Sequence, residues 1–460
     1  MNSIHFIRNL DVAVSAETLA EWHEKPGAFG RIQPPWEKAK IVNKAKAIED
    51  DLEEHIQIQM GPVKKMWIAR YHNVIKGKQF CDFQVKGPFG YWDHRHIFRD
   101  NDDKGSRLVD EITYREPMGF LGRFLAGNMI YNKLDRMFRY RHEVTRLDLE
   151  RHHQSSVKSK KILIAGGSGL VGSALEPLLK TLGHSVYILT RKPLTENHIK
   201  WNPEKGEIDR EKLHGFDAVI NLAGRNVAAP WTKKIKKELT DSRLKSTELL
   251  VKTFSELEQK PEVFISSSGS SVYPLYDGIE YDESGPMGEG FLPNLARSWE
   301  EKTAPLEKAG IRRVVLRIGI VLSPAGGAMK KMMTPFLFGL GGPFGKGDQY
   351  MSWIALDDLI DIIAFAIGDK RYSGVINAVS PQPVTNKEFC KTLAKVLHRP
   401  CFMKVPSFVL KAIPGGMGKE IFLASNRVKP GKLLESKYQF RYSDLEQTFC
   451  HLLGLQSPLA

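Results

Sequence analysis

In the larger, C-terminal part of the chain, short apolar runs rich in β-branched residues alternate with segments of helical length. The runs are KILIAG, SVYILT, DAVINLAG, EVFISSS and RRVVLRIGIVL, which begin at Lys161, Ser185, Asp217, Glu262 and Arg312. Nearly continuous apolar strands that alternate with helices are typical of a parallel sheet covered on both faces. We therefore predict an α/β fold for this part of the chain.

The N-terminal part has a different pattern, which predicts an α+β domain over residues 1–150. The runs KMWIARYHNVI and FCDFQV are rich in β-branched and aromatic residues, and RLVDEITY places Leu108, Ile112 and Tyr114 on one face of a strand. Apolar residues then recur every three to four positions from about residue 120, which indicates a long helix. The polar stretch RHHQSSVKSKK follows, and we interpret residues 151–160 as a linker.

A glycine-rich turn follows the first strand of the α/β part. Gly166, Gly169 and Gly172 have the spacing G-x-x-G-x-x-G between a strand and a helix. The first glycine permits a sharp turn, the second lets a pyrophosphate approach the backbone, and the third lets the helix pack closely. Backbone N–H groups and the helix dipole then favour phosphate. The competing interpretation is a plain βα turn whose glycines serve geometry alone.

The end of the second strand indicates which dinucleotide would bind. NAD-binding proteins usually place Asp or Glu there to hold the ribose hydroxyls. Here the strand ends in YILTRKP, which offers Arg191 and Lys192 but no acid. A guanidinium matches a 2′-phosphate in charge and geometry, so we predict NADP rather than NAD. The alternative is that Arg191 is an ordinary surface arginine.

Several motifs in order give the chain a family resemblance. They are NLAG, PWTKKIKKELTDSRLKSTELL, FISSSGSSVY, RIGIVLS, GGAMKKM, GLGGPFGKGDQYMSWIALDDL and NRVKPGKLLE. From about Lys160 to Leu455 the chain resembles the epimerase-like branch of the extended short-chain dehydrogenases, the NAD-dependent epimerase/dehydratase type. The resemblance implies a Rossmann-type NAD(P)-binding domain at 161–403 and a small substrate-side C-terminal domain of unknown function at 404–455.

The resemblance also implies roles for individual residues. The pyrophosphate would be bound by Gly166, Gly167, Ser168, Gly169, Leu170, Val171 and Gly172. Arg191 would contact the adenosine phosphate, and Leu222, Ala223 and Gly224 would lie along the cofactor. Arg243 would lie near the active site, and Ser268 falls where the family has its catalytic serine. For Arg243 the alternative is a surface arginine, and for Ser268 it is a turn residue at a strand end.

One expected pair is absent, which leaves enzymatic activity uncertain. Short-chain dehydrogenases normally use Tyr-x-x-x-Lys, in which the lysine lowers the pKa of the tyrosine so that it can transfer a proton. The corresponding positions here are Leu295 and Trp299, and the chain contains no Tyr-x-x-x-Lys. Tyr273, Tyr281, Glu283 and Glu300 are candidates to replace the pair, although each is also explained by a structural role. On the substrate side we place Arg243, Tyr273 and Trp353, the last of which core packing also explains.

The N-terminal domain resembles the helix-grip fold of the START-like (SRPBCC, polyketide cyclase-like) superfamily, on its strand pattern and the stretch GPFGYWDHRHIF. That resemblance implies an apolar ligand. His94 and His96 lie two residues apart and share a strand face, but Asp93, the nearest carboxylate, would point to the opposite face. We therefore predict no metal site and interpret the two histidines as structural or cavity-lining.

Composition and sequence signatures limit the classes of binding partner and the cellular compartment that we expect. The 460 residues carry a net charge of +14, but Lys and Arg are spread along the chain, and no RNA-module or zinc-finger signature occurs. Four scattered cysteines without CxxC favour a reducing compartment. The N-terminus lacks an apolar signal core, and MMTPFLFGLGGPF is too short to span a bilayer. We predict a cytoplasmic protein with no nucleic-acid partner and no membrane span. The sequence does not indicate an oligomeric state.

Three functions are therefore compatible with the sequence. The first is an NADP-dependent epimerase or oxidoreductase that acts on a small molecule such as an alcohol, a ketone or a nucleotide-linked sugar. The second is a non-catalytic NADP-binding sensor, which the missing Tyr-x-x-x-Lys pair favours. The third is a carrier that binds an apolar ligand through the N-terminal domain.

Overall fold

The computed structural model describes residues 3–456 apart from 44, 102–104, 117–118 and 153–157. The chain divides into two compact units. The first contains Met1–Val157 with the short pieces Lys180–Leu182 and His451–Gln456, and the second contains the rest of the chain. The division at Val157 lies inside the segment that we interpret as a linker, of which residues 153–157 lie outside the described part.

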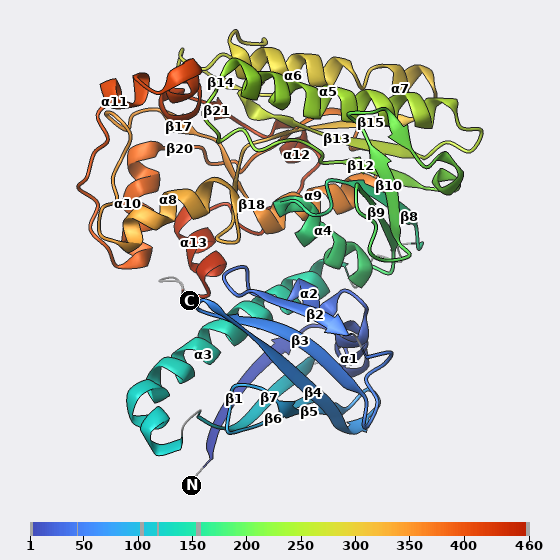
Figure 1. Cartoon of the computed structure of the whole chain (residues 1–460), viewed down its shortest axis with the longest axis vertical. Helices are drawn as coiled ribbons and strands as arrows, with labels where there is room; N and C mark the ends of the chain where they lie inside the picture. The colour runs from blue at the N-terminus through green and yellow to red at the C-terminus, as the bar shows by residue number, and fades with distance from the viewer. Residues whose placement is uncertain (1–2, 44, 102–104, 117–118, 153–157, 457–460) are drawn as a thin grey trace. The chain divides into compact units, whose positions relative to one another are not determined.

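The first unit is built on a seven-stranded sheet in the order β1-β7-β6-β5-β4-β3-β2, with every neighbouring pair antiparallel (Figure 1). Its strands are β1 (Ile4–Val12), β2 (Ala39–Asn43), β3 (Glu53–Met60), β4 (Val63–Ile75), β5 (Gln79–Lys86), β6 (Tyr91–Asp100) and β7 (Ser106–Arg115). Its helices are α1 (Ala16–Glu24), α2 (Ala28–Arg31) and α3 (Gly119–His152).

One face of this sheet packs against helices, as the alternating pattern of β7 predicts. Leu108, Ile112 and Tyr114 are all buried on that face. Phe138 of α3 packs with Ile112 and Tyr114, and Leu19 of α1 packs with Leu108. The antiparallel sheet therefore forms two apolar clusters with α1 and α3.

The second unit contains an eight-stranded sheet in the order β11-β10-β9-β8-β12-β13-β15-β19. Its strands are β8 (Lys161–Ala165), β9 (Ser185–Thr190), β10 (His198–Asn202), β11 (Glu207–Ile208), β12 (Ala218–Asn221), β13 (Val263–Gly269), β15 (Arg312–Ile318) and β19 (Gly374–Ala378). All pairs are parallel except β10–β11. The predicted parallel α/β sheet is confirmed, and β10, β11 and β19 extend it beyond the five predicted strands.

Helices cover both faces of this sheet. Figure 1 shows α5 (Lys233–Glu256), α6 (Phe291–Glu301) and α7 (Pro305–Lys308) on one side, and α4 (Leu170–Thr181) and α9 (Leu356–Gly368) on the other. On the first side, Leu250 and Phe254 of α5 pack against Val219 of β12. Burial on both faces explains why the central strands read as continuous apolar runs.

Short elements complete the second unit. They are η1 (Arg210–Leu213), η2 (Ser270–Val272), β14 (Glu280–Tyr281), β16 (Ile320–Leu322), α8 (Gly327–Leu337), β17 (Tyr350–Met351), β18 (Trp353–Ala355), β20 (Val384–Thr385), α10 (Asn386–Leu397), α11 (Ser407–Lys411), η3 (Pro414–Gly416), η4 (Gly418–Leu423), β21 (Arg427–Val428), α12 (Gly431–Glu435) and α13 (Leu445–Leu453). β21 pairs with β14, which ties the C-terminal region to the segment after β13. In the described part of the chain, no helix is both long and apolar enough to cross a membrane.

Candidate functional site

The strand order of the second unit brings a switch point of the sheet to the carboxyl ends of β8 and β12. The chain runs from β8 outward to β9 and β10 and then returns to β12 on the other side of β8, so β8 and β12 form the switch point of the sheet. Their register pairs Ala165 with Asn221, the last residue of each strand. The segments 166–172 and 222–224 therefore begin side by side, and Leu222 N donates to Ala165 O at 2.9 Å.

The turn after β8 has no room for side chains at two of its glycines. Gly166 has a φ of +86°, and a Cβ there would lie 2.7 Å from the carbonyl carbon of Leu222. A Cβ on Gly172 would lie 2.4 Å from the carbonyl oxygen of Gly166. The turn is closed by Gly169 N, which donates to Gly166 O at 3.0 Å. Substitution at either tight glycine would push the turn away from β12 or from its own helix.

This turn fits a pyrophosphate. Helix α4 begins at Leu170, and the first N–H groups of a helix have no acceptor within it. Ser168 and Gly169 are exposed, and around Gly169 a Cβ would meet only Gly166 O, at 3.2 Å. The turn thus combines open backbone with a helix N-terminus, which is the arrangement that binds phosphate groups.

Arg191 lies at the same end of the sheet. It directly follows β9, and β9 pairs with β8 in a register that sets Leu189 beside Ala165. The Arg191 side chain is exposed, and none of the described residues forms an ion pair with it. Its guanidinium is therefore available to an anionic group bound beside the glycine turn.

A buried amide orders the segment after β12. Asn221 is fully buried, and its Nδ2 donates to Thr247 Oγ1 at 2.9 Å. Its Oδ1 accepts from Ala223 N at 3.2 Å. Trp299 Nε1 also donates to Thr247 Oγ1, at 2.8 Å. Trp299, at the position that normally carries the lysine, thus supports the loop 222–224 from behind.

Arg243 of α5 lies beside this loop. A Cβ on Gly224 would lie 3.2 Å from Arg243 Cζ, and the Arg243 guanidinium lies over the Trp299 ring at 5.1 Å. Its Nη1 donates to Leu239 O at 3.1 Å. Burial lowers the pKa of Arg243 to about 10, so the side chain remains a cation at neutral pH.

Ser268 belongs to a closed network of buried side chains. Its Oγ donates to Glu300 Oε1 at 2.8 Å. Arg317 forms a bidentate pair with Glu300, with Nε to Oε1 at 2.9 Å and Nη2 to Oε2 at 2.8 Å. Arg317 Nη1 donates to the Tyr273 hydroxyl at 2.8 Å, and that hydroxyl donates to Asn377 Oδ1 at 2.7 Å. The only proton of Ser268 Oγ is directed at a carboxylate, and a catalytic role for Ser268 stays a prediction.

The remaining candidates for proton transfer are held by other hydrogen bonds. Tyr281 donates to Asp277 at 2.6 Å, while Glu283 accepts from the backbone N–H groups of Asn377 at 2.9 Å and Lys432 at 3.2 Å. Leu295, at the usual tyrosine position, is buried among apolar side chains. Each of these residues therefore has a structural role in the protein.

The two predicted substrate-side aromatic residues are fully buried. Tyr273 is stacked on Tyr281 with ring centroids 5.7 Å apart, and Trp353 Nε1 donates to Gln382 O at 2.9 Å. Both lie inside the protein rather than on an open surface, so contact with a substrate stays a prediction.

Arg317 is a site residue that the sequence pattern alone does not single out. A signal exists, because Arg317 interrupts the apolar strand RRVVLRIGIVL at a position where both faces are buried. A charge in such a strand requires a partner, and the partner is Glu300 on α6. The identity of the partner depends on a contact across the unit, which no local pattern reports.

Both parts of the second unit match families of known proteins. Residues 162–378 match the model of the NAD dependent epimerase/dehydratase family, and residues 405–452 match a domain of unknown function, DUF1731. An epimerase family protein of Mycobacterium tuberculosis is 38% identical over 286 residues, which are 62% of this chain and 94% of that protein. Human epimerase family protein SDR39U1 is 37% identical over 62% of this chain and 97% of that protein. The chain belongs to the NAD dependent epimerase/dehydratase family.

Solved structures of the epimerase family extend the likeness. The nucleoside-diphosphate sugar epimerase of Corynebacterium glutamicum covers 98% of this chain and 91% of its own, with a TM-score of 0.82 and 29% identity. Human SDR39U1, solved with NADPH, covers 64% of this chain and 98% of its own, with a TM-score of 0.59 and 35% identity. Neither family model covers the first unit, whose antiparallel sheet is established while its START-like assignment is not.

We expect Gly172→Ala to destabilise the second unit. The new methyl group would lie well inside contact distance of Gly166 O, and overpacking of this kind costs about 1–3 kcal/mol. The matched control is Gly368→Ala near the end of α9, where a Cβ meets nothing within 4 Å. Urea unfolding curves of both variants measure the difference. Equal midpoints for the two would contradict the close approach of turn and helix.

A second prediction concerns the buried ion pair. Glu300→Gln leaves the Arg317 guanidinium buried without a counter-charge, and loss of one partner of a buried pair costs about 3–5 kcal/mol. The double variant Glu300→Leu/Arg317→Met removes both charges and should be less destabilised than Glu300→Gln. Urea unfolding of the three proteins gives the comparison. A double variant that is less stable than Glu300→Gln would disprove the pairing argument.

Proposed function

We propose that this epimerase-family protein is an NADP-dependent oxidoreductase or epimerase that acts on a small molecule carrying an alcohol or ketone, such as a nucleotide-linked sugar. The observation that carries the proposal is the glycine turn at the switch point of the sheet, together with Arg191 at the end of the neighbouring strand. The turn supplies backbone N–H groups for a pyrophosphate, and Arg191 supplies a cation at the position where NAD-binding proteins have an acid.

The preference for NADP rests on charge. An arginine fork binds a phosphate through two parallel hydrogen bonds, whereas it gains little from a ribose hydroxyl. The human relative that was solved with NADPH supports the same choice. We assign Arg191 to the 2′-phosphate, residues Gly166 to Gly172 to the pyrophosphate, and Leu222, Ala223 and Gly224 to the wall along the cofactor.

When bound, the nicotinamide would supply hydride exchange with a carbon atom of the substrate. Around it, this chain contributes binding and orientation. Asn221 fixes the loop 222–224 through its bonds to Thr247 and Ala223, and Arg243 keeps a cation beside Gly224. We propose Arg243, Tyr273 and Trp353 as the substrate-side residues, with Arg243 as the one that can face an anionic or carbonyl oxygen.

Proton transfer would depart from the usual relay. We propose Ser268, at the carboxyl end of β13 next to β12, as the group that hydrogen-bonds a substrate oxygen. Glu300 Oε1 accepts the hydrogen bond that Ser268 Oγ donates. The bidentate pair with Arg317 keeps Glu300 in place. In this arrangement Arg317 acts through Glu300 and is a positioning residue.

The alternative within the same site is a non-catalytic NADP-binding sensor. It is favoured by the hydrogen bonds that already engage Ser268, Tyr273 and Glu283, and by the apolar residues at the Tyr and Lys positions. A third proposal concerns the first unit, where a START-like sheet and helix α3 would hold an apolar ligand. We also propose that the protein acts in the cytoplasm.

We expect the wild-type protein to bind NADPH at least tenfold more tightly than NADH. Arg191→Asp removes a charge-assisted hydrogen bond to the phosphate, which contributes about 1.5–3 kcal/mol, and should lower NADPH affinity by roughly ten- to 150-fold. Lys205→Asp, an exposed change of the same charge, is the control and should leave the affinity unchanged. Fluorescence titration of the bound nicotinamide measures both. Equal wild-type affinity for the two dinucleotides would overturn the assignment.

Turnover separates the enzyme from the sensor. The protein is incubated with deuterated NADPH and a panel of ketones, and with NADP⁺ and a panel of alcohols and nucleoside-diphosphate sugars. Deuterium transfer, NADPH formation or epimer formation is followed by NMR. We expect transfer to one substrate class, reduced about 100-fold or more by Ser268→Ala with NADPH affinity retained. Tight NADPH binding without transfer to any member would favour the sensor. Transfer that Ser268→Ala leaves unchanged would remove Ser268 from the mechanism.

A further inference from the structure

A cluster of polar side chains lies on the helix-facing side of the antiparallel sheet in the first unit. Its members come from different elements: Asp82 from β5, His94 and His96 from β6, Asp110 from β7 and His142 from α3. Cross-strand register brings them together, because Asp82 pairs with His94 and His96 pairs with Asp110. The proposed NADP function uses none of these residues.

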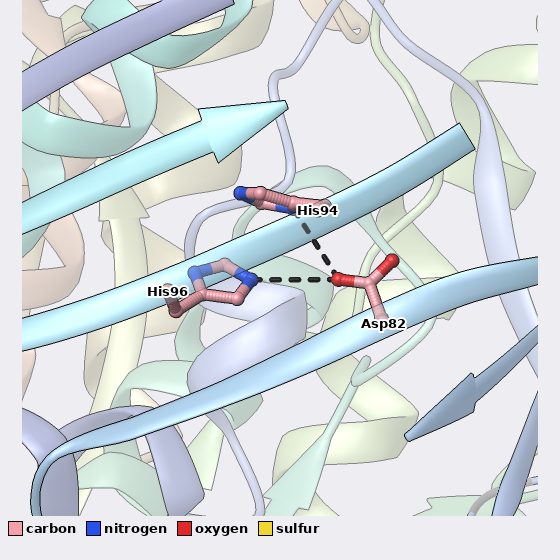
Figure 2. A group of neighbouring side chains, drawn as sticks. All are labelled: Asp82, His94 and His96. Atoms are coloured by element: carbon pink, nitrogen blue, oxygen red, sulfur yellow. Dashed lines mark ion pairs between the residues drawn. The ribbon is translucent and has the colours of Figure 1, made fainter. Parts of the chain in front are cut away.

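Three of these side chains converge on one point. Asp82 Oδ2 lies 3.3 Å from His94 Nδ1 and 3.5 Å from His96 Nε2, as Figure 2 shows. One ligand atom from each residue lies within 4.8 Å of the other two. A tetrahedral ion with ligands at ~2.1 Å separates neighbouring ligand atoms by about 3.4 Å, so these distances match the edge of a metal coordination shell.

The other nitrogen of each histidine faces a second carboxylate. His94 Nε2 is hydrogen-bonded to Asp110 Oδ1 at 3.0 Å, and His96 Nδ1 lies 2.8 Å from the same oxygen. Asp110 Oδ2 in turn contacts His142 Nε2 at 2.5 Å. Metal-binding histidines almost always use their second nitrogen in this way, because the carboxylate fixes the ring and raises its basicity. Asp110 thus orients the His94 imidazole by a hydrogen bond and lies within ion-pair distance of His96 Nδ1.

Burial and charge are consistent with an ion at this point. His94 and Asp110 are buried, whereas the side chains of Asp82 and His96 keep 18% and 13% exposure, which leaves access for an ion. His96 stacks on Phe80 at 4.2 Å, so an apolar ring covers one side. Two carboxylates, Asp82 and Asp110, lie beside the imidazoles and supply the cluster with anionic oxygen atoms.

We propose that Asp82, His94 and His96 form a binding site for a divalent transition-metal ion in the first unit, with Asp110 as the residue that orients His94 and lies behind His96. Two imidazoles and one carboxylate suit zinc and iron(II), and a three-ligand set leaves a position open for water or a further ligand. Asp93 is not part of it, because its carboxylate pairs with His72 at 2.9 Å, as its position on the opposite face predicts. The carboxylate that the local sequence lacks comes from the neighbouring strand.

The test uses the full chain without an affinity tag. Protein stripped with a chelator is equilibrated with Zn²⁺, separated from free ion by gel filtration, and its metal content is measured by mass spectrometry. We expect one Zn²⁺ per chain in the wild type and loss of at least nine-tenths of it in Asp82→Asn and His94→Ala. His72→Ala and Asp93→Asn change the same residue types on the same sheet and should retain the metal. Zinc content near zero in the wild type, or content unchanged in the site variants, would overturn the proposal.

Because buried variants can fail to fold, Co²⁺ provides a measurement on the wild type alone. Co²⁺ bound by two imidazoles and a carboxylate at four coordination should give strong visible absorption, while surface-bound Co²⁺ keeps the weak spectrum of the hydrated ion. Only the weak spectrum in the wild type would argue against the site. NADPH affinity, measured in parallel, should be the same with and without metal, so that failure of the metal site and failure of the cofactor site are distinguishable.

Discussion

The candidate site depends on one steric constraint, the close approach of the β8–α4 turn to the chain that leaves β12. Gly166 and Gly172 sit within van der Waals contact of backbone atoms, at positions where any side chain would collide. This approach keeps the β8–α4 turn and the start of the loop 222–224 next to each other at the switch point of the sheet. The proposed pyrophosphate contacts follow from it, since they are backbone groups whose positions the turn sets.

A second constraint comes from the buried charges near this switch point. The bidentate pair of Arg317 and Glu300 is almost fully enclosed, and it uses the Ser268 proton and the Tyr273 hydroxyl as further partners. A buried ion pair of this kind is often no more stabilising than apolar residues of similar volume. In this chain, Leu295 and Trp299 of α6 occupy the positions of the usual proton relay. The ion pair beside β13 is therefore better explained by the positioning of Ser268 than by a gain in stability.

The parts of the fold that the sequence predicted are those set by local pattern. The glycine turn, five strands of the parallel sheet and the buried face of β7 follow from spacing and periodicity within a few residues. β10, β11 and β19 were not predicted; β10 alternates polar and apolar residues (HIKWN), and β11 has only two residues. Partners across the fold, such as Glu300 for Arg317 or Asp82 for His94, depend on register and packing, and no local pattern contains that information.

The histidine cluster shows how much such long-range pairing can change an interpretation. Within β6, the alternation HRH places a basic pair on one face and Asp93 on the other, and this local view lacks a carboxylate. The adjacent strands supply two, one on each side of the imidazole pair. Polar groups in a protein interior require compensation, and here five side chains from four elements compensate one another in the middle of an otherwise apolar core. Replacing such a buried cluster by apolar residues of similar volume is often neutral or stabilising, so its presence is consistent with the cation site that we propose.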